Sequence, residues 1–198
     1  MEPLLIAGLG NPGDEYVHTR HNAGSDFLNL ICSKYSLILK KENQILGSYA
    51  IHEIDNLKLI LLIPSTYMNE SGLCIAKSKK FFGLNTDQIL IAHDELDLAN
   101  AEIKLKDSGG HGGHNGLRNI IDQLQGDNSF KRLRIGIGHP GKNKDVTSYV
   151  LKKAPKLQRQ TLLESLFDYL DIGERLSLDG WEKTVMNYHS KKKDSDES

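Results

Sequence analysis

The sequence predicts a single α/β domain with a mixed β-sheet. Short apolar runs of strand length alternate with segments of helical periodicity, which is the pattern of a layered α/β fold. Two of the apolar runs, 45–54 and 58–63, flank the turn-forming pair Asp55-Asn56. This pair predicts a hairpin, and therefore an antiparallel pair of strands within the sheet. The length of 198 residues suits one domain.

Six strands are expected, each of them a short apolar run. They occupy residues 4–9, 45–54, 58–63, 88–93, 103–106 and 134–138. Helical spacing of apolar residues predicts helices at 22–35, 69–82, 114–124, 156–175 and 179–189. Together these elements define a domain over residues 1–189, and the charged, low-complexity segment 190–198 is expected to be a disordered tail.

The composition predicts a soluble cytoplasmic protein. Hydrophobic residues make up 38% of the chain and charged residues 26%, and no apolar run approaches the length of a membrane span. The first residues carry neither the basic region of a signal peptide nor the Arg- and Ser-rich composition of a transit peptide. The two cysteines, Cys32 and Cys74, form neither a disulfide framework nor a metal motif, which fits a reducing compartment.

Positive charge is concentrated in one part of a chain whose net charge is −1. Residues 104–156 hold eleven Lys and Arg residues but four Asp and Glu residues, so this segment has a net charge of +7. A one-sided basic segment of this kind suits phosphate binding. A solvated basic face without a ligand is the alternative that charge alone leaves open.

The sequence GLGNPG at residues 8–13 matches the G-x-G-x-x-G pattern of dinucleotide-binding proteins. In those proteins a helix opens at the third glycine, and its N-terminus holds the pyrophosphate. Here a polar loop follows Gly13, the acids Asp14 and Glu15 would repel a pyrophosphate, and the next helical pattern begins near Asn22. NAD binding is therefore disfavoured.

Polar residues follow the apolar runs at the places where an open α/β sheet binds ligands. They gather in four stretches, GNPGDEYVHTRHNAG (10–24), PSTYMNESG (64–72), LIAHDELD (90–97) and GGHGGHNGLR (109–118). Taken singly, each residue has a structural explanation. Asn69 and Asn115 could cap helices, His21 could lie on the surface, and Tyr67 and Met68 could pack in the core. The occurrence of one His, one Asp and three Asn residues at such transitions favours a functional site.

This set of residues fits hydrolysis by an activated water. A neutral histidine takes a proton from water near neutral pH, a carboxylate on its other nitrogen fixes the tautomer, and Asn side chains donate to a developing oxyanion. No serine lies in a G-x-S-x-G elbow, and neither cysteine lies near a histidine, so covalent catalysis is less favoured. A metal-dependent hydrolase using His111, His114 and Asp94 is an alternative. It is disfavoured because both histidines lie in a glycine-rich stretch rather than on a helix.

The motifs resemble those of bacterial-type peptidyl-tRNA hydrolases. The matching stretches are GLGNPGDEYVHTRHNAG, PSTYMNESG, HDELD, GGHGGHNGLR and RLRIGIGHPG, in the family's order between about residues 4 and 150. The resemblance implies a three-layer domain, with a twisted mixed β-sheet between α-helices, and a monomeric cytoplasmic enzyme without metal or cofactor. It also implies hydrolysis of the ester bond between tRNA and a peptide or N-blocked aminoacyl group, which frees the tRNA for reuse in translation. Gly8, Gly10 and Gly13 would then form a tight turn that presents Asn11.

The resemblance also implies roles for ten residues. His21 matches the base that activates water, Asp94 matches the acid that holds this base, and Asn11 matches a residue that helps to place the water. Seven further residues match contacts to the 3′ end or the acceptor stem of the tRNA substrate: Tyr16, Tyr67, Met68, Asn69, Asn115, Lys106 and Arg134. Of these, the two basic residues match a pair that holds the 5′-phosphate. A non-catalytic RNA-binding relative is the alternative, and the complete catalytic set argues against it.

Overall fold

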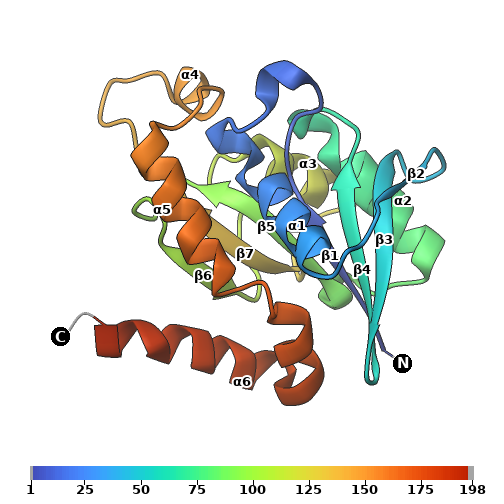
Figure 1. The fold of residues 1–198 in the computed structure, drawn as a ribbon. Helices are drawn as coiled ribbons and strands as arrows, with labels where there is room; N and C mark the ends of the chain where they lie inside the picture. The colour runs from blue at the N-terminus through green and yellow to red at the C-terminus, as the bar shows by residue number, and fades with distance from the viewer. Residues whose placement is uncertain (1, 196–198) are drawn as a thin grey trace.

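The computed structural model describes residues 2–195 and has a seven-stranded mixed β-sheet between two layers of α-helices (Figure 1). This confirms the predicted fold class. The strands are β1 (Glu2–Gly8), β2 (Lys40–Glu42), β3 (Gly47–Ile54), β4 (Leu57–Pro64), β5 (Ile89–Glu95), β6 (Ile103–Lys106) and β7 (Lys131–Gly136). The α-helices are α1 (Ala23–Lys34), α2 (Ser71–Phe82), α3 (Asn115–Gln123), α4 (Val146–Val150), α5 (Lys156–Phe167) and α6 (Ile172–Ser195). Four 3₁₀ turns are η1 (Asp14–Tyr16), η2 (Arg20–Asn22), η3 (Met68–Glu70) and η4 (Thr86–Gln88).

The strand order brings the carboxyl ends of the central strands to one edge of the sheet. The order is β2-β3-β4-β1-β5-β7-β6, in which β4, β1, β5 and β7 are parallel and the other strands run antiparallel to their neighbours. The predicted hairpin joins β3 and β4, and Asp55 in its turn has a positive φ of 48°. The loops that follow β1, β4 and β5 therefore leave the sheet at the same edge, which is where α/β proteins bind ligands.

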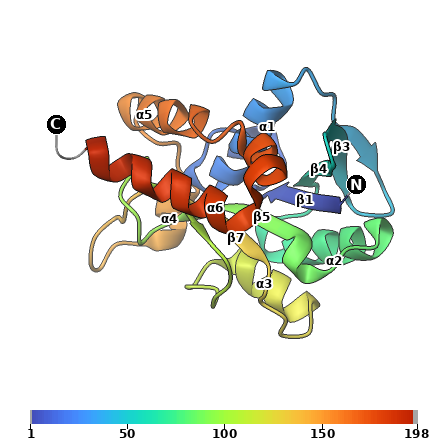
Figure 2. The ribbon, with the colours of Figure 1, turned by 90° about the horizontal axis from the view of Figure 1, so that it is seen from below.

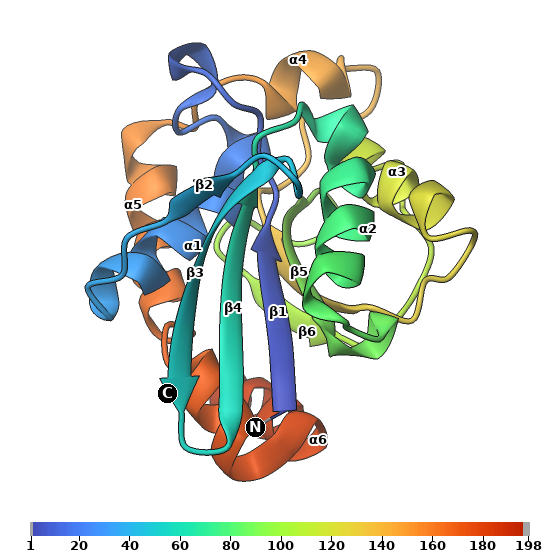
Figure 3. The same cartoon turned by 90° about the vertical axis from the view of Figure 1, so that its right-hand side faces the viewer.

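Helices cover both faces of the sheet, with α1 and α5 on one side and α2 and α3 on the other (Figures 2 and 3). Leu4 and Ile6 of β1 pack in one core with Phe27 of α1. Leu5 and Ala7 belong to the second core, beneath α2 and α3. This alternation follows from the two-residue period of a strand. Within the described part of the chain, no helix is both long enough and apolar enough to cross a membrane.

Two glycines let α1 pack close to the ends of the central strands. A Cβ atom on Gly24 would lie 2.2 Å from the carbonyl oxygen of Ala92 and 2.7 Å from the backbone nitrogen of Leu9. A Cβ atom on Gly8 would lie 2.3 Å from the carbonyl oxygen of Gly24. Only glycine allows such an approach of backbone to backbone. As a result, the N-terminus of α1, and His21 just before it, lie beside the end of β5.

Two short elements, β2 and α4, were not predicted. β2 is a charged edge strand of three residues, so it has no apolar alternation, and it forms by pairing with β3. α4 has five residues, too few to show helical periodicity, and the side chain of Asp145 caps it by accepting from the backbone N–H of Thr147 at 3.0 Å. Elements this short depend on their neighbours for stability.

The boundaries of the C-terminal helices differ from the predicted ones. The helix expected over 156–175 ends at Phe167, and α6 begins after a short turn and includes the helix expected at 179–189. Gly180 kinks α6 with a φ of 70°. The tail expected at 190–198 lies partly in α6, which runs to Ser195, and its last three residues lie outside the described residues, so its disorder stays a prediction.

We expect the substitution Gly24→Ala to lower the free energy of unfolding by about 1–3 kcal/mol, because the new methyl group would meet backbone atoms that cannot move aside. Urea unfolding measures this change. Gly110→Ala is the control, since its φ is not positive and a Cβ atom there would have no described atom within 4 Å. Equal stability of the two variants would contradict the close approach of α1.

Candidate active site

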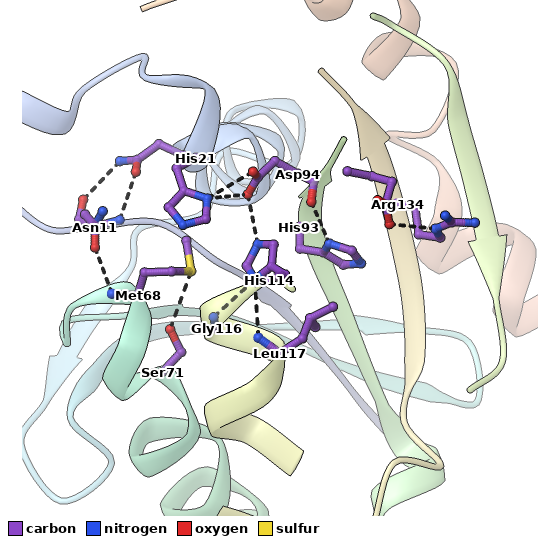
Figure 4. A network of polar contacts seen from close by, with 12 residues as sticks. Asn11, His21, Met68, Ser71, His93, Asp94, His114, Gly116, Leu117 and Arg134 are labelled. Carbon is purple, nitrogen blue, oxygen red and sulfur yellow. Dashed lines mark hydrogen bonds and ion pairs between the residues drawn. The ribbon is translucent and has the colours of Figure 1, made fainter. Parts of the chain in front are cut away.

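The site is built around Asp94, which lies near the end of β5. Its side chain accepts a hydrogen bond from Nδ1 of His21, with distances of 2.8 Å to Oδ1 and 2.9 Å to Oδ2. His21 reaches it from η2, the turn before α1. Figure 4 shows this contact, and both residues are buried. The predicted base and the predicted acid are therefore brought into direct contact, although 73 positions separate them in the chain.

A second histidine, His114, holds the same carboxylate. Its Nε2 lies 3.0 Å from Oδ1 of Asp94, and its Nδ1 accepts from the backbone N–H groups of Gly116 at 3.1 Å and Leu117 at 3.3 Å (Figure 4). Because Nδ1 accepts, the proton of the neutral ring is on Nε2, which donates to Asp94. A helix cap was the structural alternative considered for Asn115, but His114 is the N-cap of α3. The sequence signal for this role was a histidine at the first position of the predicted helix 114–124.

The tautomer of His21 follows from the same carboxylate. Asp94 is an acceptor only, so Nδ1 of His21 carries the proton and Nε2 is the unprotonated nitrogen. Nε2 makes no hydrogen bond to any residue between 2 and 195, and His21 lines a pocket. The free lone pair of the ring is thus available to a molecule in the pocket.

The environment shifts the pKa values of these groups in opposite directions. Burial alone would raise the pKa of Asp94, but the charges of His21 and His114 and their hydrogen bonds hold it well below its usual range. Burial alone would lower the pKa of His21, but the Asp94 carboxylate outweighs it and raises the pKa above its ordinary value of 6.5. Behind them, burial and the neighbouring His114 lower the pKa of His93 to about 3. The site therefore combines a fixed carboxylate with one histidine whose protonated form that carboxylate stabilises.

Asn11 is held at both its backbone and its side chain. The side chain of Asn22 accepts from the backbone N–H of Asn11 at 2.8 Å and donates to its carbonyl oxygen at 3.0 Å. The side-chain oxygen of Asn11 accepts from the backbone N–H of Met68 at 2.7 Å. This bond orients the side-chain amide and leaves its NH₂ group without a protein partner among the described residues, so the NH₂ group can donate to a molecule in the pocket. Asn22 was not predicted as a site residue, because an asparagine directly before a helix is ordinarily interpreted as a helix cap.

These side chains open into a pocket of about 460 Å³. Eight of the ten predicted residues line it: Asn11, Tyr16, His21, Tyr67, Met68, Asn69, Asp94 and Asn115. Tyr16 and Tyr67 meet edge to face at its rim, with ring centroids 6.3 Å apart. A wall that the sequence did not reveal comes from α4 and includes Val146, Val150 and Leu151. The pocket thus joins a polar floor to an apolar wall.

The predicted basic pair lies outside this pocket, on the β6–β7 ladder. Lys106 pairs across the ladder with Arg132, and Lys104 pairs with Arg134, so the four basic side chains share one face of the sheet. We call these four residues the basic face. Nε of Arg134 lies 3.0 Å from Oε2 of Glu95, which is next to Asp94 and lines the pocket. The basic face is therefore continuous with the edge of the site.

Arg132 of the basic face anchors the glycine-rich loop that carries His114. Its guanidinium is buried and donates to the carbonyl oxygens of Gly109 and Gly110. Charge-assisted hydrogen bonds to backbone carbonyls of this kind are strong enough to order a loop that glycines leave free. No feature of the sequence predicted that this arginine is buried.

The side chains offer one cluster with the composition of a metal site, but its chemistry does not suit a metal. Among the described residues this cluster is His21, Asp94 and His114, whose ligand atoms lie within 4.8 Å of one another. His111 is not part of it, and its Nδ1 accepts from the backbone N–H of Gly113. A metal on Nε2 of His114 would move the ring proton to Nδ1, which already accepts two backbone N–H groups. The metal-dependent alternative with His111 is therefore disfavoured.

Comparison with known proteins identifies the family. The family model described as peptidyl-tRNA hydrolase matches residues 5–196. The chain belongs to the peptidyl-tRNA hydrolase family. It is 45% identical over 188 residues to a peptidyl-tRNA hydrolase of Pseudomonas fluorescens, covering 95% of this chain and 97% of the relative. It is 47% identical over 183 residues to one of Acinetobacter baylyi, covering 92% and 93%.

Solved structures agree with the sequence relatives. A crystal structure of peptidyl-tRNA hydrolase from Acinetobacter baumannii superposes with a TM-score of 0.83 at 41% identity, covering 95% of this chain and 91% of that one. At this identity the likeness extends from the fold to the family. The resemblance inferred from the strand-end motifs is thereby confirmed, and the described peptidyl-tRNA hydrolase fold carries those motifs at one edge of its sheet.

We expect NMR titration to give His21 a pKa above 6.5 and to show that Asp94→Asn lowers it. The neutral amide no longer stabilises the imidazolium ion, while burial continues to disfavour it, so the shift is downward. An unchanged pKa of His21 in the variant would contradict the pairing with Asp94.

Proposed function

We propose that this protein hydrolyses the ester bond between tRNA and a peptide or N-blocked aminoacyl group, using a water molecule that His21 activates. The observation that carries this proposal is the geometry of His21, whose Nδ1 is held by Asp94 and whose Nε2 is free toward the pocket. Membership of the peptidyl-tRNA hydrolase family supports the substrate class.

In the proposed reaction, Nε2 of His21 takes a proton from water as the oxygen attacks the ester carbonyl. Asp94 stabilises the imidazolium ion that results, as the carboxylate of a catalytic triad does. The NH₂ group of Asn11 donates to the water or to the oxyanion, because the side-chain oxygen of Asn11 already accepts a hydrogen bond from the backbone N–H of Met68. Collapse of the tetrahedral intermediate breaks the ester bond, and the ribose oxygen leaves with the proton from His21. General-base catalysis supplies a factor of about 10²–10⁴.

Two further asparagines, Asn69 and Asn115, are proposed to hold the peptide and the 3′ end. Both line the pocket at the starts of short elements, η3 and α3. An N-acyl group presents an amide that such side chains can pair with, whereas a free ammonium group does not. This difference would favour peptidyl-tRNA over aminoacyl-tRNA. Tyr16 and Tyr67, with Met68 beside them, are proposed to contact the terminal nucleotide, and each base stacked on an aromatic ring contributes about 1–3 kcal/mol.

The basic face is proposed to bind the RNA backbone, with Lys106 and Arg134 at the 5′-phosphate of the acceptor stem. Support comes from its continuity with the pocket through Glu95. Phosphate contacts are independent of sequence and weaken as salt rises, which suits an enzyme that accepts many tRNAs. We infer that the protein acts as a cytoplasmic monomer without metal or cofactor, in line with the hydrogen-bonded state of His114.

A non-catalytic RNA-binding protein of the same fold is the rival function. It would need the basic face, but it would not need a buried carboxylate aligned with two histidines. Burying an ionised group is unfavourable unless the group is fully paired. A protein that only binds RNA would gain nothing from such a cluster to offset this free-energy cost. The His21–Asp94–His114 cluster therefore favours catalysis.

We expect the protein to release N-acetylated amino acid from its tRNA in the presence of a chelator, and to leave free aminoacyl-tRNA intact. His21→Ala should lower kcat at least about 100-fold with KM near that of wild type, because only the general base is lost. His52→Ala, remote from the pocket, is the control. A His21 variant that keeps more than a few per cent of the activity would remove this residue as the base. Binding of tRNA without release by the wild type would favour the non-catalytic function.

We expect the double variant Lys106→Ala, Arg134→Ala to raise KM for full-length substrate about tenfold and to spare a short ester that ends at the terminal nucleotide. The short ester does not reach the basic face. Lys77→Ala with Lys80→Ala on α2 removes the same charge from another surface and should change neither value. Equal losses on the long and the short substrate would refute the phosphate clamp.

A further inference from the structure

The turn that carries His21 is fastened to α4 by the residue next to the base, Arg20. Its guanidinium nitrogen Nη1 donates to the carbonyl oxygens of Tyr149 and Lys152 at 3.3 Å each and of Lys153 at 3.4 Å. Nη2 donates to the side chain of Gln158 on α5 at 3.4 Å. The guanidinium also lies 4.0 Å from the centroid of the Tyr149 ring. One side chain thus contacts the last turn of α4, the segment after it and α5.

Backbone contacts run in the same direction. The N–H of Arg20 donates to the carbonyl oxygen of Lys152 at 3.2 Å, and Thr19 forms an isolated bridge with Lys153. The hydroxyl of Tyr149 donates to the carbonyl oxygen of Ile137, just past β7, at 2.7 Å. The aromatic ring under the arginine is therefore itself fixed to the sheet.

α4 is held by these contacts and by Val150, which packs in the core. It is five residues long, and a helix of that length is not stable by itself. The segment that leads into it is exposed and includes Gly141 and Asn143 with positive φ values. A cation at the carbonyl end of a helix is favourable, and a planar guanidinium serves several carbonyl groups at once. In Figure 1, α4 lies beside the loop between β1 and α1, at the top of the view.

α4 matters to the site because it forms the apolar wall of the pocket. Val146, Thr147, Val150 and Leu151 line the pocket opposite the polar residues that surround His21. If α4 shifted, the volume beside the ester would change, while the His21–Asp94 pair would keep its own hydrogen bonds. A change in the position of α4 can therefore be distinguished from a change in the hydrogen bonds of His21.

We infer that Arg20 is a positioning residue, which holds α4 against the turn of His21 and so fixes the wall that contacts the acyl part of the substrate. The contact of this wall with the substrate rests on the proposed function, whereas the anchoring of α4 does not. Arg20 lies next to the base in the chain but acts through α4.

Two measurements test this role in Arg20→Ala and in the milder variant Arg20→Lys. Amide hydrogen exchange over residues 146–153 should be faster in both variants, since a lysine cannot stack on Tyr149 or serve the same set of carbonyl groups. KM for N-acylaminoacyl-tRNA should rise about tenfold, while kcat changes less than about threefold. The fall in kcat at low pH, which reports protonation of His21, should occur at the same pH as in the wild type.

Arg175→Ala is the matched control, because Arg175 also pairs with neighbours, Asp171 at 2.8 Å and the ring of Tyr188 at 5.2 Å, but on α6. It should change neither exchange over residues 146–153 nor KM. Unchanged exchange in both Arg20 variants would overturn the inference. A fall in kcat together with a shift of its pH dependence at low pH would also overturn the inference, because His21 itself would then be disturbed. Absence of hydrolysis by the wild type would refute the proposed function, and the exchange rates would still decide whether Arg20 anchors α4.

Discussion

The site depends on one buried carboxylate that two histidines satisfy. Asp94 can stay ionised inside the protein because His21 and His114 both donate to it, and an unpaired charge there would be strongly unfavourable. This requirement fixes much of the surrounding structure. His114 must keep its proton on Nε2, so its Nδ1 faces the first N–H groups of α3. His21 must approach from the other side, which needs the close contact of Gly24 with the sheet.

The pocket is assembled from loops, turns and one short helix, which polar side chains hold together. Asn22 holds the loop that bears Asn11, Arg132 holds the glycine-rich loop, and Arg20 holds α4. In all three cases the partners include backbone groups, so the contacts constrain the path of the chain and not only side chains. Contacts of this kind can hold a site built on loops with the precision that catalysis needs.

The charge of the molecule is arranged for a phosphate-rich partner in spite of a net charge of −1. Antiparallel pairing of β6 and β7 places Lys104, Lys106, Arg132 and Arg134 on one face, while their apolar neighbours enter the core. Three of these four already have partners: Arg134 pairs with Glu95, Lys104 pairs with Glu102, and Arg132 holds the glycine-rich loop. Electrostatic attraction over such a face acts at long range, whereas the chemistry depends on contacts of about 3 Å.

The sequence by itself determined the α/β class, most strands, and the polar residues at strand ends, including His21, Asp94, Asn11 and the tyrosines. Apolar runs and turn residues are local signals, and the site residues follow strands whose carboxyl ends must meet at one edge. Only the tertiary structure decided that His114 rather than Asn115 caps α3, that Asn22, Arg20 and Arg132 hold the loops, and that α4 walls the pocket. These contacts join residues far apart in the chain, and the hydrogen bonds that select them are to backbone groups, which every residue carries alike.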